Sequence, residues 1–292
     1  MRAPDRAEFV ELNRIRLRVW EWGDRDAPPI ICAHGAMDHG RMWDGFAPRL
    51  ADLGYRVVAP DLRGHGDSGR LASVNIWGAT VLDLATVAGQ VGGPVGWLGH
   101  SFGAGVAMYA AAIWPELTRW VVSLDGVGPP PQAFESRDLV ESARAGLDGV
   151  RRALDGPPRV YPTREDMVER RLRVNTRLPR QWAEHLVEHG SVMTEGGWTW
   201  KADRFMGVGL PGPFDLAYLE AELEALRAPT LVLTGAEHDM WSEMSEPEVA
   251  ERLTHLVTAE HSVIAGAGHY VHLEQPDAVM SAITEFLGRV GP

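Results

Sequence analysis

The sequence predicts an α/β protein with a mostly parallel, doubly wound sheet. Five short apolar runs lack the alternation of a half-exposed strand, which is typical of strands buried on both faces of a parallel sheet. They span residues 30–33, 56–59, 95–98, 120–124 and 230–233. Helical patterns lie between them, at residues 42–53, 76–91 and 102–114. Because strand and helix alternate, we expect helices on both faces of one sheet.

The first segment has a different pattern. Residues 9–22 alternate Ile15, Leu17 and Val19 with Arg14, Arg16 and Arg18. Strict alternation predicts a strand with one face buried and one face in water. We therefore expect an antiparallel strand here.

The alternation of predicted strands and helices is interrupted between residues 127 and 213. Turn-forming stretches rich in glycine and proline lie at both borders, and the sequence between them has the pattern of amphipathic helices. The predicted helices cover residues 134–154, 164–176 and 179–189, with a short β element at 197–201. We interpret 127–213 as a helical cap, and 1–126 with 214–292 as the core domain. A helix over 214–226 is expected to return the chain to the sheet.

Composition excludes several function classes. The 292 residues carry a net charge of −12, which argues against a nucleic-acid partner. Cys32 is the single cysteine, so neither an internal disulfide nor a multi-cysteine metal site can form. The N-terminal segment has neither a signal peptide nor a membrane-span pattern. A cytoplasmic location is the default expectation, and a monomer and a homodimer remain open.

Gly99-His100-Ser101-Phe102-Gly103 fits the pattern G-x-S-x-G. An apolar strand enters this motif and a small-residue helix leaves it, as in a nucleophile elbow. The sharp turn is expected to strain the serine backbone and to direct the N-terminus of the helix at the site. Ser101 is therefore the predicted nucleophile.

A serine nucleophile needs a base, and the base needs a carboxylate. His269 follows a predicted strand at 262–264 on a glycine-rich loop, whereas His185, His189 and His255 lie in helical text and are expected at the surface. Asp239 and Asp125 both follow buried strands. The chain order Ser, Asp, His favours Asp239, with Asp125 as the alternative. Glu237 is a weaker third candidate.

Together these motifs resemble the α/β-hydrolase superfamily. The resemblance rests on His34-Gly35, the run from Asp61 to Gly69, the elbow at Ser101, Gly235 to Asp239, and Gly268-His269. It implies an eight-stranded, mostly parallel sheet with a cap after the sixth strand. It also implies Ser101, His269 and Asp239 as the triad, and an oxyanion hole from the backbone N–H groups of Ala36 and Phe102. Related epoxide hydrolases and haloalkane dehalogenases carry aspartate at the elbow, where this chain has serine.

The leading hypothesis is a serine hydrolase that cleaves a carboxylic ester, or a related acyl bond, of a small to medium apolar substrate. A meta-cleavage C–C bond hydrolase and a ligand-binding, receptor-like member of the fold are the alternatives. The first would need a cation for a substrate carboxylate, and Arg177, Arg180 and Lys201 are the candidates. Substrate-binding side chains are expected among Met37, Trp43, Trp182, Trp198 and Trp200. No cofactor or metal is expected, because the mechanism needs none and no ligand spacing suggests one.

Overall fold

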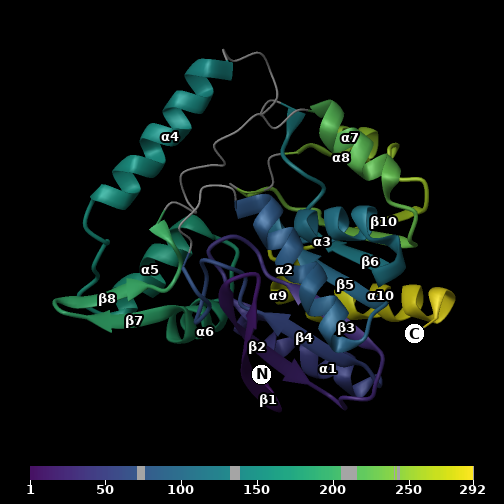
Figure 1. Cartoon of the computed structure of the whole chain (residues 1–292), viewed down its shortest axis with the longest axis horizontal. Coiled ribbons are helices and arrows are strands. Elements are labelled where there is room, and N and C mark those ends of the chain that lie inside the picture. The colour runs from purple at the N-terminus through teal and green to yellow at the C-terminus, as the bar shows by residue number, and fades with distance from the viewer. Residues whose placement is uncertain (71–75, 132–138, 205–215, 240, 242–243, 292) are drawn as a thin grey trace.

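The protein is built on one eight-stranded sheet, seen in the computed structural model (Figure 1). The structure describes residues 1–70, 76–131, 139–204, 216–239, 241 and 244–291. The strands are β1 (Arg6–Leu12), β2 (Ile15–Trp22), β3 (Pro29–Ala33), β4 (Arg56–Pro60), β5 (Val95–His100), β6 (Thr118–Leu124), β9 (Thr230–Gly235) and β10 (Ala259–Ile264). Their order is β1-β2-β4-β3-β5-β6-β9-β10, and every pair from β4 to β10 is parallel. The predicted fold class is confirmed.

The N-terminal segment forms two strands where the alternation predicted one. β1 pairs antiparallel with β2 from Arg6↔Glu21 to Leu12↔Ile15, and β2 pairs antiparallel with β4. The hairpin turns at Asn13 and Arg14, whose φ angles are 48° and 61°. Two consecutive residues with positive φ are typical of a tight type I′ hairpin turn. The turn was missed because it lacks the usual glycine.

Two apolar cores lie on opposite faces of the sheet. Alternate residues of β3 divide between them: Ile30 and Cys32 belong to one, Ile31 and Ala33 to the other. Three helices cover the first face: α1 (Ala47–Asp52), α9 (Val271–Glu274) and α10 (Pro276–Val290). Four cover the second: α2 (Ile76–Val91), α3 (Phe102–Ile113), α7 (Leu216–Ala225) and α8 (Glu246–Leu253). The helix predicted at 42–53 is a 3₁₀ turn, η1 (Gly40–Gly45), followed by α1.

The segment between β6 and β9 is mostly helical, as predicted. It contains α4 (Leu139–Asp155), α5 (Arg164–Val174), α6 (Arg180–Gly190) and a hairpin of β7 (Ser191–Thr194) with β8 (Gly197–Trp200). The short β element was expected, but its partner β7 was not. Figure 1 shows α5, α6 and the hairpin together beside the sheet. Residues 132–138 and 205–213 of the predicted cap lie outside the described residues.

The inserted segment packs on the core through α5 and α6. Met167 and Leu186 are fully buried in the same apolar core as α1 and α10. These helices share a hydrophobic core with the sheet, and polar side chains of the segment contact the loops after β3 and β10. Among the helices of the described ranges, none has the length and apolar character needed to cross a membrane.

Candidate active site

Ser101 lies on the turn between β5 and α3. Its φ and ψ angles are 52° and −120°, a conformation that costs a non-glycine residue about 1–3 kcal/mol. Two glycines make room for the turn. A Cβ on Gly99 would lie 2.4 Å from Ala104 Cα, and one on Gly103 would lie 2.3 Å from Ala33 O. The predicted strain at Ser101 is therefore found in the structure, and the turn also requires glycine at positions 99 and 103.

The imidazole of His269 pairs with Asp125. Asp125 Oδ2 lies 2.7 Å from His269 Nδ1, and both side chains are nearly buried. Asp125 follows β6 directly and adopts a φ of 50°. Its backbone N–H donates to Leu233 O at 2.8 Å, and its Oδ1 accepts from Gly235 N–H at 3.3 Å. These contacts with β9 fix the carboxylate, which in turn fixes the histidine ring.

The preference for Asp239 as the partner of the histidine ring was wrong. Asp239 Oδ2 accepts the backbone N–H of His269 at 3.1 Å, and Oδ1 accepts that of Trp241 at 2.8 Å. The reason is the strand order, since Ser101 directly follows β5, β6 neighbours β5, and β9 lies one strand farther away. Asp239 thus holds the histidine loop, and the alternative Asp125 reaches the ring. Glu237, the third candidate, lies 3.9 Å from Arg177 Nη1.

The loop after β3 is fixed by two buried histidines. His34 Nε2 accepts the N–H of Leu62 at 2.9 Å, and His65 Nε2 accepts the N–H of Met37 at 3.2 Å. Met37 has a φ of 64°, so the loop turns sharply beside Ala36. Phe102 is the first residue of α3, and its N–H has no acceptor within the helix. Gly103 packs on the carbonyls of Ala33 and His34, which brings this loop against the start of α3.

Comparisons with known proteins identify the family of this fold. The model of the alpha/beta hydrolase family matches residues 30–282. The chain belongs to this family. The hydrolase is 29% identical to epoxide hydrolase A of Mycobacterium tuberculosis, with 96% of each chain covered. It is 28% identical to a serine hydrolase-like protein of Danio rerio, covering 94% of this chain and 86% of the relative.

A solved structure is similar over the whole chain. The hypothetical protein PA1622 of Pseudomonas aeruginosa PAO1 superposes with a TM-score of 0.83 at 25% identity, covering 97% of this hydrolase and 98% of that chain.

The hydrolase has a buried polar cluster that the sequence analysis missed. Asp38, on the loop after β3, forms an ion pair with Arg171 of α5, and the hydroxyl of Tyr270 donates to Asp38 Oδ2 at 3.2 Å. Tyr270 follows His269, so the cluster joins the inserted segment to both active-site loops. Burial raises the pKa of Asp38, and the guanidinium of Arg171 opposes that shift. No local motif marks these residues, because they come from three distant parts of the chain.

His100 stabilises the loop that carries His269. Its Nε2–H donates to the backbone carbonyl of His269 at 2.9 Å. Burial, followed by the neighbouring His269, lowers the pKa of His100 well below its usual value. A neutral His100 therefore holds the backbone of His269 without adding a charge beside its ring.

The five predicted substrate-binding side chains take different places. Trp43 is fully buried and stacks on His272, with ring centres 4.9 Å apart, so it is a core residue and not part of an accessible pocket. Trp182 is also buried, at the contact of α6 with Gly45. Met37, Trp198 and Trp200 are half-buried and remain candidates. Trp241, which was not predicted, stacks on the ring of His269 with centres 6.4 Å apart and is 47% exposed.

The three cations suggested for a substrate carboxylate already have acidic partners. Arg177 Nε donates to Glu274 Oε2 at 2.9 Å, and Lys201 Nζ lies 2.6 Å from Asp67 Oδ1. Arg180 pairs with Glu165 and Glu169 within the inserted segment. Their charges are therefore engaged in ion pairs within the protein.

Proposed function

We propose that the protein is a serine hydrolase that cleaves a carboxylic ester, or a related acyl bond, of a small to medium apolar substrate. The observation that carries this proposal is the 2.7 Å contact between His269 Nδ1 and Asp125 Oδ2 beside the elbow at Ser101. A histidine held by a buried carboxylate is the base that a serine nucleophile requires. The triad proposed here is Ser101, His269 and Asp125.

The chemistry follows from these positions. Ser101 Oγ attacks the acyl carbon and passes its proton to Nε2 of His269, while Asp125 stabilises the imidazolium. The backbone N–H groups of Ala36 and Phe102 stabilise the oxyanion, aided by the N-terminus of α3. His269 then protonates the leaving group, an acyl-enzyme forms, and water releases the acid by the reverse sequence.

The inserted segment, proposed as a cap over residues 127–213, selects the small-molecule substrate. Candidate contacts with the substrate are three half-buried apolar side chains, Met37 on the loop after β3 and Trp198 and Trp200 on β8. Trp241 adds a fourth beside the ring of His269. Among the relatives, the serine hydrolase-like protein supports a serine mechanism. The epoxide hydrolase is similar in fold, but members with that activity carry aspartate where this chain has Ser101.

The test is Ser101→Ala, with Ser262→Ala as a matched control on exposed β10. Turnover of a panel of p-nitrophenyl esters and labelling by a fluorophosphonate probe are measured for both. We expect Ser101→Ala to lose at least about 10³-fold in kcat and all labelling, because the nucleophile is gone. The control should match the parent protein. Full activity in Ser101→Ala would exclude the mechanism, and an unlabelled, inactive parent protein would favour a ligand-binding role.

A further inference from the structure

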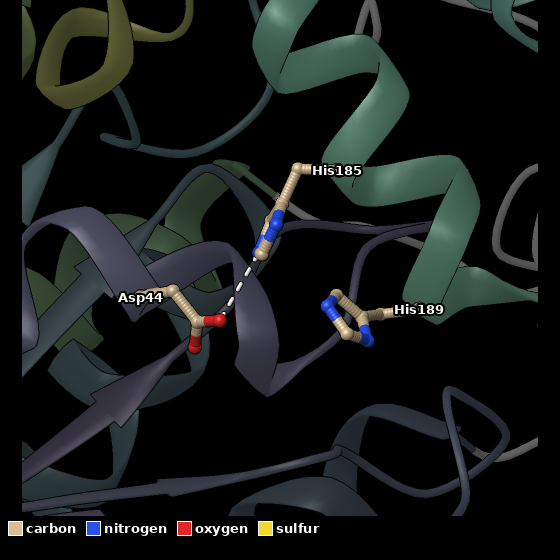
Figure 2. A group of neighbouring side chains, drawn as sticks. All are labelled: Asp44, His185 and His189. Carbon is tan, nitrogen blue, oxygen red and sulfur yellow. Dashed lines mark ion pairs between the residues drawn. The ribbon is translucent and has the colours of Figure 1, made fainter. Parts of the chain in front are cut away.

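A second cluster of chemically active side chains lies where the inserted segment meets the core. His185 and His189 are one turn apart on α6, and Asp44 lies on η1 of the core. One potential ligand atom from each residue lies within 4.8 Å of the other two. Figure 2 shows the three side chains turned toward the same space between α6 and η1. The triad uses none of them.

The spacing of these atoms suits a metal ion. Histidines at positions i and i+4 share one face of a helix, an arrangement that recurs in zinc-binding helices. His185 Nε2 lies 3.2 Å from Asp44 Oδ2. Two ligands of a tetrahedral Zn²⁺ with bonds of about 2.0–2.1 Å are about 3.3 Å apart. These two atoms already have that separation, and the half-buried ring of His189 brings a third ligand atom within 4.8 Å of one from each of the other two residues.

The surroundings determine which ions fit. Arg41 engages Asp44 with Nε 2.8 Å from Oδ1 and Nη2 2.5 Å from Oδ2, so the carboxylate is already neutralised. Hard cations such as Ca²⁺ and Mg²⁺ need several oxygen ligands and gain little here. Imidazole nitrogens suit Zn²⁺, Ni²⁺ and Cu²⁺. His39 Nε2 donates to Leu186 O at 3.0 Å, and His39 is not among the residues whose ligand atoms lie within 4.8 Å of one another. His185 Nε2 likewise lies 3.0 Å from Arg41 O, so a bound ion must replace that contact.

We propose that Asp44, His185 and His189 bind a divalent transition-metal ion that joins the inserted segment to the core. The ion would bind Asp44 Oδ2 and Nε2 of a neutral His185 whose proton lies on Nδ1. Nε2 would then give up its present 3.0 Å contact with Arg41 O, while Arg41 keeps its contact with Asp44 Oδ1. The bond would fasten α6 to η1, which directly follows the loop carrying Ala36 and Asp38. Occupancy of the site would therefore strengthen the attachment of the segment beside the proposed oxyanion hole.

The test uses the full chain without an affinity tag. Zn²⁺ is titrated calorimetrically, Co²⁺ is followed by its visible absorption, and the melting temperature is recorded with and without Zn²⁺. We expect one Zn²⁺ per chain, a higher melting temperature, and a Co²⁺ spectrum typical of tetrahedral coordination. His189→Gln and His185→Gln should each weaken Zn²⁺ binding at least tenfold and remove the thermal shift.

His255→Gln is the matched control, since His255 contacts Glu224 elsewhere on the surface. Its affinity for Zn²⁺ should equal that of the parent protein. His189→Gln carries the test if His185→Gln folds poorly, because the ring of His189 is only half-buried. Equal Zn²⁺ affinity in all variants, loss of binding in His255→Gln alone, no binding at all, or equal binding of Ca²⁺ would each overturn the proposal.

Discussion

The sheet and the inserted segment are stabilised by different interactions. The strands of the core bury apolar side chains on both faces, as Ile30 and Ile31 do at full burial. The inserted segment also packs on the core through apolar side chains, but charged contacts surround this apolar interface. In five of them the basic group comes from the segment and the acid from the core. They are Arg171 with Asp38, Arg177 with Glu274 and with Glu237, His185 with Asp44, and Lys201 with Asp67.

This difference indicates a division of roles. Apolar burial is non-directional and tolerates no water, so the sheet is a rigid frame for Ser101 and His269. Charged contacts are directional and depend on each partner being present. We therefore expect core substitutions at the site to act on the chemical step, and junction substitutions to act on the attachment of the segment.

The largest effect is expected at the acid of the triad. Asp125→Asn keeps the shape of the side chain but no longer fixes the tautomer of His269, so kcat should fall about 10⁴-fold. Asp239→Asn is the matched variant at the end of the next strand, and its kcat should stay within about tenfold of the parent value. Steady-state kinetics with one ester substrate distinguish the two. The reverse order would restore Asp239 as the triad acid.

The next effect tests the junction. Arg171→Ala leaves the buried carboxylate of Asp38 without its cation, so the free energy of unfolding should fall by about 3–5 kcal/mol. Arg180→Ala removes exposed ion pairs within the segment and should give no measurable change. Urea denaturation of both variants is the measurement. Equal stability of the two would mean that the buried pair does not fasten the segment.

The smallest effect is expected on the stability of the protein at acidic pH, where the buried His65 of a core loop contributes. Burial lowers the pKa of His65 to about 4, so between pH 6.5 and 4 the unfolded chain binds a proton that the folded protein does not. Stability should therefore fall as pH decreases through this window, by about 1.4 kcal/mol per pH unit for this group. Urea denaturation at pH 7 and pH 5 should show a smaller loss in His65→Gln. An unchanged loss would assign the acid sensitivity to other groups.

The sequence predicted the core better than the inserted segment. Buried parallel strands have a local signature in unbroken apolar runs, and the predicted cores of β3, β4, β5, β6 and β9 all lie within observed strands. Ser101 and His269 were predicted for the same reason, since each lies near a strand end, with glycine two residues to either side of Ser101 and directly before His269.

The failures have a common physical cause, which is that they depend on contacts between distant residues. Both Asp125 and Asp239 follow buried strands, and only the order β5-β6-β9 decides which one meets the ring of His269. Trp43 is an aromatic residue of the kind that often lines a pocket, but its packing against His272 places it in the core. His185 and His189 were expected at the surface, and their contact with η1 half-buries them.

Cys32 supplies a kinetic reporter that the protein carries naturally. It is the single cysteine of the chain, lies in β3 at the middle of the sheet and is fully buried, and burial raises the pKa of its thiol. An alkylating reagent can reach this sulfur only in molecules whose sheet has opened. Because Cys32 lies on a central strand, paired with Leu98 of β5, we expect it to stay covered when the inserted segment alone detaches. The rate of alkylation therefore counts openings of the sheet separately from movements of the segment above it.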